Sequence, residues 1–154
     1  MPKTLEQLRD QLSAIEADDS IYDGIGPSEI PQLEQLLQDN EAWMASRAVF
    51  ALSRLSDIRA ATLLSRATAD PRPEVRVAAA ASVTNLKPND ANDILLTLLT
   101  DPDLGVRKFA VQSVAGTHNR AVHAKLRDLE TQDPAPWIRE IAKSKLRELR
   151  LIKP

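Results

Sequence analysis

Apolar residues recur along most of the chain at intervals of three and four, the spacing of one face of an α-helix. The pattern returns in four segments that each start at an aspartate, and the starts are separated by 31, 31 and 32 residues: Asp39, Asp70, Asp101 and Asp133. Five, nine and thirteen residues after each aspartate stand an apolar residue, an alanine, and a leucine or valine. This register predicts a helix after each aspartate, near 41–55, 73–86, 104–116 and 136–150.

A second apolar pattern precedes each aspartate, as with Leu95, Leu98 and Leu99 before Asp101. It predicts four further helices near 28–38, 57–69, 90–100 and 118–130. Side chains that can cap a helix N-terminus stand near each start, namely Ser28, Ser56-Asp57, Asn89-Asp90 and Thr117. The second helices begin at positions that tolerate proline, such as Pro73 and Pro136.

The two patterns together predict an all-α superhelix built from four helical hairpins. A hairpin of this size cannot bury its own apolar stripe, so neighbouring hairpins must stack. We expect one domain over residues 1–154, with repeats at 28–56, 57–87, 88–117 and 118–150. Residues 1–27 should supply a helix near 3–18, with Leu5, Leu8, Leu12 and Ile15 covering the open end, followed by an acidic loop over 19–27.

The repeated motif Asp-Pro-x-x-x-Val-Arg-x-x-Ala resembles the HEAT-like repeats of the phycobilisome lyase (PBS lyase) type. The resemblance covers about residues 28–150. It implies a right-handed α-solenoid whose second helices line a concave face, used mostly to bind other proteins. Some members of the family handle bilin chromophores on phycobiliproteins, although the repeat motif does not encode that activity. The first copy departs from the pattern, because it has Ala45 where the others have arginine.

Composition supports a helical, soluble chain. Leu and Ala each occur 21 times among 154 residues, whereas aromatic residues make up 3% of the chain, and this argues against a β-sandwich or barrel. The absence of cysteine excludes disulfides, thiol catalysis and cysteine-ligated zinc. No apolar run is long enough to span a membrane and no signal peptide opens the chain, so the sequence predicts a cytoplasmic protein. A net charge of −2 gives no global attraction to nucleic acid.

Three aspartates are each followed six residues later by an arginine, which suggests a structural ladder. The pairs are Asp70 with Arg76, Asp101 with Arg107, and Asp133 with Arg139. Each aspartate can accept hydrogen bonds from the N-terminus of the second helix, and each arginine can reach the aspartate of the neighbouring repeat. A feature that recurs from one repeat to the next serves the repeat, so we interpret these three pairs as structural and not catalytic.

The sequence contains no recognisable arrangement for catalysis, metal binding or cofactor binding. His118 and His123 are the only histidines, and their spacing of five puts them on different sides of one helix. No glycine-rich phosphate-binding loop and no nucleophile motif is present. We therefore predict a non-enzymatic protein with no cofactor, no metal site and no small-molecule substrate.

The second helices carry a stripe that points away from the predicted core. The stripe lies four, seven and eleven residues after each aspartate, and nine of its twelve residues are the candidate partner-binding residues: Trp43, Ser46, Phe50, Val77, Ala81, Lys108, Gln112, Glu140 and Ser144. Exposed Trp43, Phe50 and Val77 would form an apolar anchor for another protein, and Lys108, Gln112 and Glu140 would supply polar contacts. In the alternative reading, Trp43 packs under the N-terminal helix or the 19–27 loop and forms no site.

The function predicted on these grounds is that of a scaffold or adaptor that binds a partner protein on its concave face. A lyase-like accessory protein that attaches bilin to phycobiliproteins, or removes it, is the alternative from a different class. A nucleic-acid-binding solenoid ranks third. It would use the basic last helix, where Arg139, Lys143, Arg147 and Arg150 lie near one stripe.

Overall fold

The computed structural model describes residues 1–152, in which α-helices follow one another without a strand. The chain runs through α1 (Leu5–Leu12), α2 (Ile30–Leu37), α3 (Ala42–Ser53), α4 (Ile58–Ala67), α5 (Pro73–Ser82), α6 (Pro88–Leu98), α7 (Leu104–Ser113), α8 (Arg120–Gln132) and α9 (Pro136–Arg150). Short 3₁₀ helices occupy Asp19–Tyr22, Pro27–Glu29 and Val83–Asn85. The all-α prediction is confirmed. The last two residues of the predicted domain, 153 and 154, lie outside the described residues.

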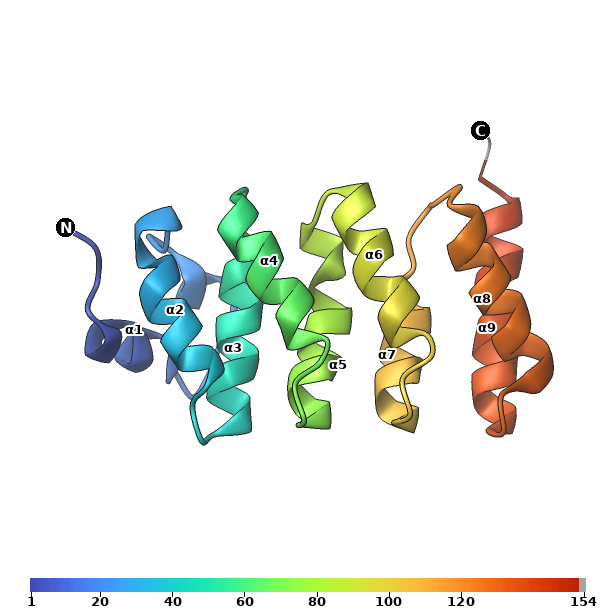
Figure 1. Cartoon of the computed structure of the whole chain (residues 1–154), viewed down its shortest axis with the longest axis horizontal. Helices are drawn as coiled ribbons and strands as arrows, with labels where there is room; N and C mark the ends of the chain where they lie inside the picture. Colours follow the sequence, from blue (N-terminus) through green and yellow to red (C-terminus); the bar gives the residue numbers. More distant parts are fainter. Residues whose placement is uncertain (153–154) are drawn as a thin grey trace.

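Helices α2 to α9 form two parallel layers (Figure 1). The first helices of the hairpins, α2, α4, α6 and α8, make one layer, and the second helices, α3, α5, α7 and α9, make the other. The first three second helices contact one another more extensively than the corresponding first helices do. Closer packing on one side curves the stack toward that side, so the second helices form its inner layer.

The core is assembled from the register that defines the repeats. The residues five positions after each aspartate (Met44, Val75, Val106, Ile138) and nine positions after it (Ala48, Ala79, Ala110, Ala142) are 0% exposed. Burying a side chain such as Val75 or Ile138 contributes about 1.5–3 kcal/mol of transfer free energy. The alanines let successive second helices approach closely, since they carry only a methyl group.

The N-terminal helix is shorter than the sequence pattern suggested. Helix α1 ends at Leu12, so the expected helix near 3–18 is wrong in its second half, and Ile15 is 98% exposed instead of packing on the core. Leu8 and Leu12 are buried against the first repeat, where α1 lies across the end of the stack (Figure 1). The expected acidic loop over 19–27 contains the 3₁₀ helix Asp19–Tyr22, capped by Asp18.

The helix starts agree with the capping signals only in part. Asp57 caps α4 as expected, by accepting from the backbone N–H of Arg59 at 2.8 Å. Helix α6 starts earlier than expected, at Pro88, so Asn89 lies inside its first turn and is not its cap. Helix α8 starts later and is capped by Asn119. Within residues 1–152, no helix is both long enough and apolar enough to cross a membrane.

Candidate protein-binding surface

The aspartate before each second helix shapes the turn that leads into it. In all four repeats its Oδ1 accepts a hydrogen bond from the backbone N–H two residues later, at 2.8–2.9 Å. An aspartate that bonds its own backbone in this way stabilises a tight turn. The turn therefore fixes the direction in which each second helix leaves its hairpin.

Two arginines connect consecutive turns of the inner layer. Arg76 donates from Nε and Nη2 to the carboxylate of Asp101, at 2.8 and 3.1 Å, and Arg107 makes the same pair with Asp133, at 2.8 and 3.3 Å. Each arginine also donates from Nη1 to the carbonyl of the aspartate that precedes its own helix, which is Asp70 for Arg76 and Asp101 for Arg107. These contacts tie the second, third and fourth repeats together at one edge.

The junction of the first two repeats uses different residues, because Ala45 stands where a ladder arginine would be. There Arg72 donates to both carboxylate oxygens of Asp70, at 3.0 Å each, and from Nη1 to the carbonyl of Asp39 at 2.5 Å. The carboxylate of Asp39 is in turn bound by Arg9 of α1. The N-terminal helix thus supplies an arginine to the first turn.

These contacts change the ionisation of the groups that make them. Partial burial of Asp70 acts to raise its pKa, but the hydrogen bonds from the Arg72 side chain and backbone outweigh burial and hold that pKa below its usual value. The hydrogen bond to Asp101 raises the pKa of Arg76, and the bond to Asp70 raises the pKa of Arg72. Asp70, Arg72 and Arg76 are therefore charged at neutral pH.

The inner layer exposes a face that points away from the first helices, which we call the second-helix surface. Of the predicted partner-binding residues, Trp43, Gln112, Glu140 and Ser144 are exposed on it, and Ser46, Phe50, Val77, Ala81 and Lys108 are half-buried. Ser46 donates to the carbonyl of Glu74 at 3.3 Å, which shows how a residue seven places after one aspartate meets a residue four places after the next. Phe50 and Val77 pack partly against the core.

Two aromatic residues outside the predicted set add to this surface. Phe109 is 37% exposed and Trp137 is 42% exposed, and the Nζ of Lys108 lies 5.7 and 5.8 Å from the centres of their rings. Cation–π contacts of this kind hold the lysine over the rings. Trp137 stands in the stripe position four residues after Asp133, so the spacing contained the signal for it. Phe109 stands eight residues after Asp101, outside the stripe positions, so the same spacing does not identify it.

Trp43 remains partly accessible although charged groups surround it. Its Nε1 donates to Glu41 at 3.0 Å, and the guanidinium of Arg47 lies 5.3 Å from its ring. Even so, Trp43 is 45% exposed. The residue therefore offers an aromatic face to solvent and is not covered by the N-terminal helix.

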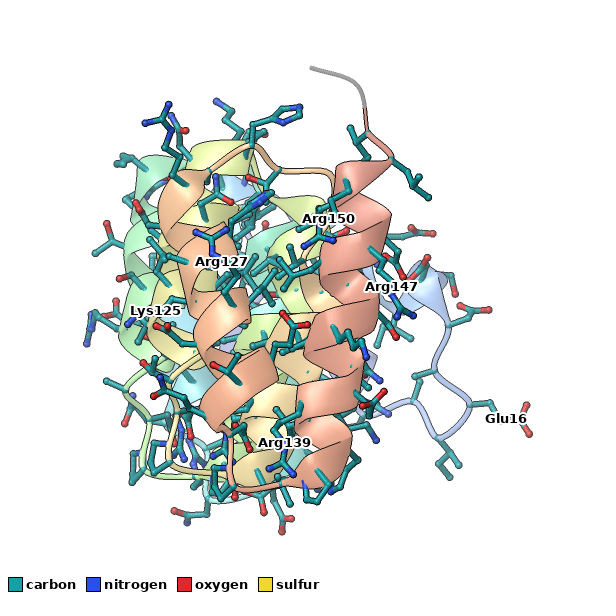
Figure 2. The ribbon with its side chains drawn as sticks, turned by 90° about the vertical axis from the view of Figure 1, so that its right-hand side faces the viewer. Glu16, Lys125, Arg127, Arg139, Arg147 and Arg150 are labelled. Carbon is teal, nitrogen blue, oxygen red and sulfur yellow. The ribbon has the colours of Figure 1, made fainter. Side chains whose placement is uncertain are left out.

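The segment that follows α1 borders one end of the second-helix surface. Arg47 on α3 holds it by donating to the carbonyls of Leu12 and Ala14, the latter at 2.8 Å. Arg54, at the end of the same helix, donates to Asp19 at 2.7 Å. Seen from the far end of the stack, the segment projects beyond the inner layer and carries Glu16 outward (Figure 2).

The second-helix surface is acidic toward the first two repeats and of mixed charge toward the last two. Exposed Glu16, Glu41 and Glu74 lie toward the first two repeats, whereas half-buried Lys108 lies on α7 and exposed Glu140 on α9. A basic segment of a partner would be attracted to the acidic end of this surface.

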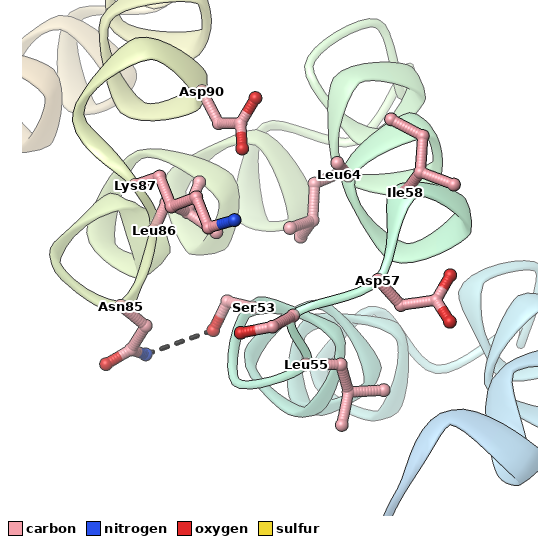
Figure 3. Close-up of a pocket in the computed structure, with 11 residues that line it drawn as sticks. Ser53, Leu55, Asp57, Ile58, Leu64, Asn85, Leu86, Lys87 and Asp90 are labelled. Carbon is pink, nitrogen blue, oxygen red and sulfur yellow. Dashed lines mark hydrogen bonds between the residues drawn. The ribbon is translucent and has the colours of Figure 1, made fainter.

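Several pockets lie outside this surface. One of about 190 Å³ lies where the start of α4 faces the start of α6, between Asp57, Ile58 and Asp90 (Figure 3). Its Ser53 hydroxyl donates to the carbonyl of Phe50 and accepts from Asn85, so it is not paired with a general base. Within residues 1–152, no group of three potential ligands gathers to hold a metal ion.

Most of this architecture matches a known protein family. Residues 60–147, more than half of the chain, match the family described as HEAT repeats. The chain belongs to the HEAT repeat family. The match spans helices α4 to α9, and the hairpins in it are the HEAT repeats of this protein. A search of curated proteins gives no match.

Solved structures with the same fold include two helical repeat proteins. The complex of CpcE and CpcF of phycocyanin lyase from Nostoc sp. PCC7120 contains a chain with a TM-score of 0.65 and 19% identity, over 92% of this chain and 96% of that one. A designed armadillo repeat protein in complex with the peptide (KR)4 has a TM-score of 0.53 and 17% identity, over 94% and 81% of the two chains. The resemblance to the repeats of PBS lyases is therefore confirmed at the level of fold.

In this HEAT repeat protein the ladder and the exposed aromatic residues have different positions. The ladder lies at one edge of the stack, in the turns between first and second helices, where Asp101 and Asp133 are buried. Trp43, Phe109 and Trp137 stand on the second helices themselves. The turns thus stabilise the packing of the HEAT repeats, and the aromatic residues of the second-helix surface stay partly exposed to solvent.

Proposed function

We propose that this HEAT repeat protein is a non-enzymatic adaptor that binds a partner protein on its second-helix surface. The observation that carries the proposal is the presence of Trp43, Phe109 and Trp137 on that surface, each 37–45% exposed. Tryptophan and aromatic residues in general are enriched among the residues that dominate binding energy. Phe50, Val77 and Ala81 extend the apolar area between them.

The stacked helices hold these residues in place before a partner arrives. The aromatic rings stand on α3, α7 and α9, whose directions are fixed by the aspartate turns. Preorganisation lowers the entropy lost on binding, so a surface of ordinary size, burying about 1,200–2,000 Å² in total, suffices for a stable complex. The polar residues Ser46, Gln112, Glu140 and Ser144 would then select among partners.

Affinity purification from a lysate of the source organism tests this proposal. The baits are the wild-type protein, the double variant Trp43→Ala/Trp137→Ala, and the control variant Ile58→Ala. Ile58 is 80% exposed but lies on α4 in the outer layer. The control therefore also removes exposed apolar area, but from the layer opposite the second-helix surface. We expect a partner that wild type and Ile58→Ala retain and the tryptophan variant loses.

The tryptophan variant must keep its helical circular dichroism for this result to count. Retention of the same partner by all three baits would contradict the proposal. Loss from Ile58→Ala alone would place the binding site on the outer layer.

A second candidate function is that of an accessory protein for bilin attachment to phycobiliproteins or bilin removal from them. The observation that favours it is the fold shared with a chain of the phycocyanin lyase complex over more than nine-tenths of both chains. Its test is the visible absorption spectrum of free bilin, and of a phycobiliprotein, after addition of the purified protein. A shifted bilin band that Trp43→Ala/Trp137→Ala abolishes would support this candidate, and an unchanged spectrum would count against it.

A further inference from the structure

Arg139 occupies the position of a ladder arginine, and residues 1–152 contain no later aspartate turn for it to bind. Its Nη1 donates to the carbonyl of Asp133 at 2.6 Å, as the Nη1 atoms of Arg76 and Arg107 do to the aspartates of their own repeats. In those two residues, Nε and Nη2 then bind the carboxylate of the next aspartate. Within residues 1–152, no carboxylate accepts from Nε or Nη2 of Arg139, and the guanidinium is held in the pose that binds one.

The surface around Arg139 is strongly basic. We call it the terminal face, and it is the side of α8 and α9 that points away from the third repeat (Figure 2). Figure 2 shows five cations on it: Lys125, Arg127, Arg139, Arg147 and Arg150. Lys143 follows Arg139 by one helical turn and therefore shares its stripe. The same two helices carry four acidic residues, Asp128, Glu130, Glu140 and Glu148, which are fewer than these cations.

The terminal face is not built to receive another apolar HEAT repeat. Ten residues after their aspartates, Val49, Ala80 and Val111 are 0% exposed and pack between repeats. The equivalent residue of the last repeat is Lys143. Covering this lysine with apolar side chains would remove it from water without a partner charge, which is costly. A partner for this face must therefore bring negative charge.

We propose that the terminal face binds an acidic segment of a partner protein, with one carboxylate of the segment seated on Nε and Nη2 of Arg139. The other cations would attract the rest of the segment and increase the rate of encounter. The ligand chemistry follows from the ladder, where the same guanidinium pose binds an aspartate in both examples. This surface is separate from the second-helix surface, so the two proposals can fail independently.

A protein carboxylate fits the terminal face better than nucleic acid does. The face is one helical hairpin wide, whereas binding to a nucleic acid backbone usually follows a long basic groove with aromatic residues on which bases stack. Trp137, the aromatic residue of α9, lies instead beside Lys108 toward α7. The short, forked site at Arg139 matches a single carboxylate.

The test uses the intact chain with ¹⁵N-labelled arginine and a blocked peptide of alternating Asp and Glu as the probe. Binding is followed by NMR through the Nε–Hε signals of the arginines, which identify the guanidinium that the carboxylate contacts. We expect a saturable shift of the Arg139 signal. Loss of a charge-assisted, two-point contact in Arg139→Gln should weaken binding by about tenfold or more.

Two further variants test whether binding requires the forked geometry of Arg139 or only a positive charge anywhere on the protein. Arg139→Lys keeps the charge but removes the planar fork, and it should also weaken binding. Lys87→Gln, which removes a cation exposed at the start of α6, should leave binding unchanged. Equal weakening by Lys87→Gln and Arg139→Gln, or no effect of either Arg139 variant, would overturn the proposal.

A second probe, a single-stranded oligothymidine of similar charge, tests the nucleic acid alternative at the same ionic strength. Weaker binding of this oligonucleotide than of the acidic peptide supports the proposal. Tighter binding, with the shifts spread over several arginines, would overturn it in favour of a nucleic acid ligand.

Discussion

Arg76 binds Asp101 through two parallel hydrogen bonds, from Nε at 2.8 Å and from Nη2 at 3.1 Å, across the boundary between the second and third repeats. Both side chains are largely buried, with exposures of 13% and 5%. In a stack where each repeat contacts only its neighbours, stability depends on the interfaces between repeats. A paired charge at such an interface couples the folding of one repeat to that of the next.

Removal of Arg76 should destabilise the protein strongly, because it leaves the buried carboxylate of Asp101 without its partner. For Arg76→Met we expect a loss of about 3 kcal/mol in the free energy of unfolding, as is usual when one member of a buried ion pair is removed. Urea unfolding followed by far-UV circular dichroism measures this loss. A broader transition should accompany it, since the repeats on either side would unfold less cooperatively.

The matched control for this variant is Arg66→Met. Arg66 pairs with Glu34 between first helices at 3.0 Å, but the two side chains are 62% and 50% exposed. An exposed ion pair contributes about 0–1 kcal/mol, so this variant should unfold close to wild type. Similar losses in both variants would show that the ladder has no special role in stability.

Acid should weaken the junction of the first two repeats through Asp70. Hydrogen bonds from Arg72 outweigh the opposite effect of burial and lower the pKa of Asp70 from its ordinary value of 3.8. A group with a lowered pKa in the folded state stabilises the protein above its unfolded-state pKa, and this stabilisation is lost as the pH falls through the folded-state pKa. Between about pH 5 and pH 2, wild type should therefore lose more stability than Asp70→Asn does.

Unfolding midpoints measured across that pH range test this expectation, with Asp93→Asn as a control for the change in charge. Asp93 is exposed on α6. If the pH dependence is the same in wild type and Asp70→Asn, the hydrogen bonds from Arg72 to ionised Asp70 do not stabilise the folded protein.

The ladder shows which contacts the sequence could predict. A period of 31 residues and a fixed Asp-to-Arg spacing placed Arg76 beside the turn of the next repeat, because helical geometry converts equal spacing into equal positions. Arg72 could not be found in this way. It stands two residues after Asp70 and follows no repeated rule, and its contact with Asp39 exists only once the two turns lie side by side.

The N-terminal segment illustrates a second limit. Apolar spacing from Leu5 to Ile15 is helical throughout, yet the helix ends at Leu12, and the Ser13 hydroxyl donates to the carbonyl of Arg9. The course of the following residues is set by Arg47, which reaches them from α3 across 33 and 35 positions of sequence. Long-range side-chain to backbone contacts of this kind leave no periodic signal.

Arg47 should therefore control the order of the segment after α1. In Arg47→Gln the carbonyls of Leu12 and Ala14 lose a charged donor, so the amides of residues 5–22 should exchange with solvent about tenfold faster or more. Hydrogen–deuterium exchange measured by mass spectrometry reports this change. Arg59→Gln is the control, since Arg59 bonds mainly to Asp57 at the start of α4, and the N-terminal peptides should exchange as in wild type.

The fluorescence of the two tryptophans measures how accessible the second-helix surface is to solvent. Trp43 and Trp137 are the only tryptophans, and both are partly exposed. Acrylamide should therefore quench most of the fluorescence in each of the single-tryptophan variants, Trp43→Phe and Trp137→Phe. Fluorescence that resists quenching in Trp137→Phe would mean that Trp43 is covered, as in the alternative reading of the sequence.

Replacing two cations of the terminal face with apolar residues should convert it into a self-associating surface. The double variant Lys143→Val/Arg147→Ala copies the residues of the third repeat, Val111 and Ala115, onto the last one. It removes two of the charges that keep this face in water and exposes an apolar stripe like those that pack between repeats. The sedimentation coefficient of the variant should rise with protein concentration, while that of Lys87→Val, an exposed lysine outside this face, stays constant. A variant that sediments like wild type at every concentration would show that the remaining cations, Lys125, Arg139 and Arg150 among them, are enough to keep copies apart.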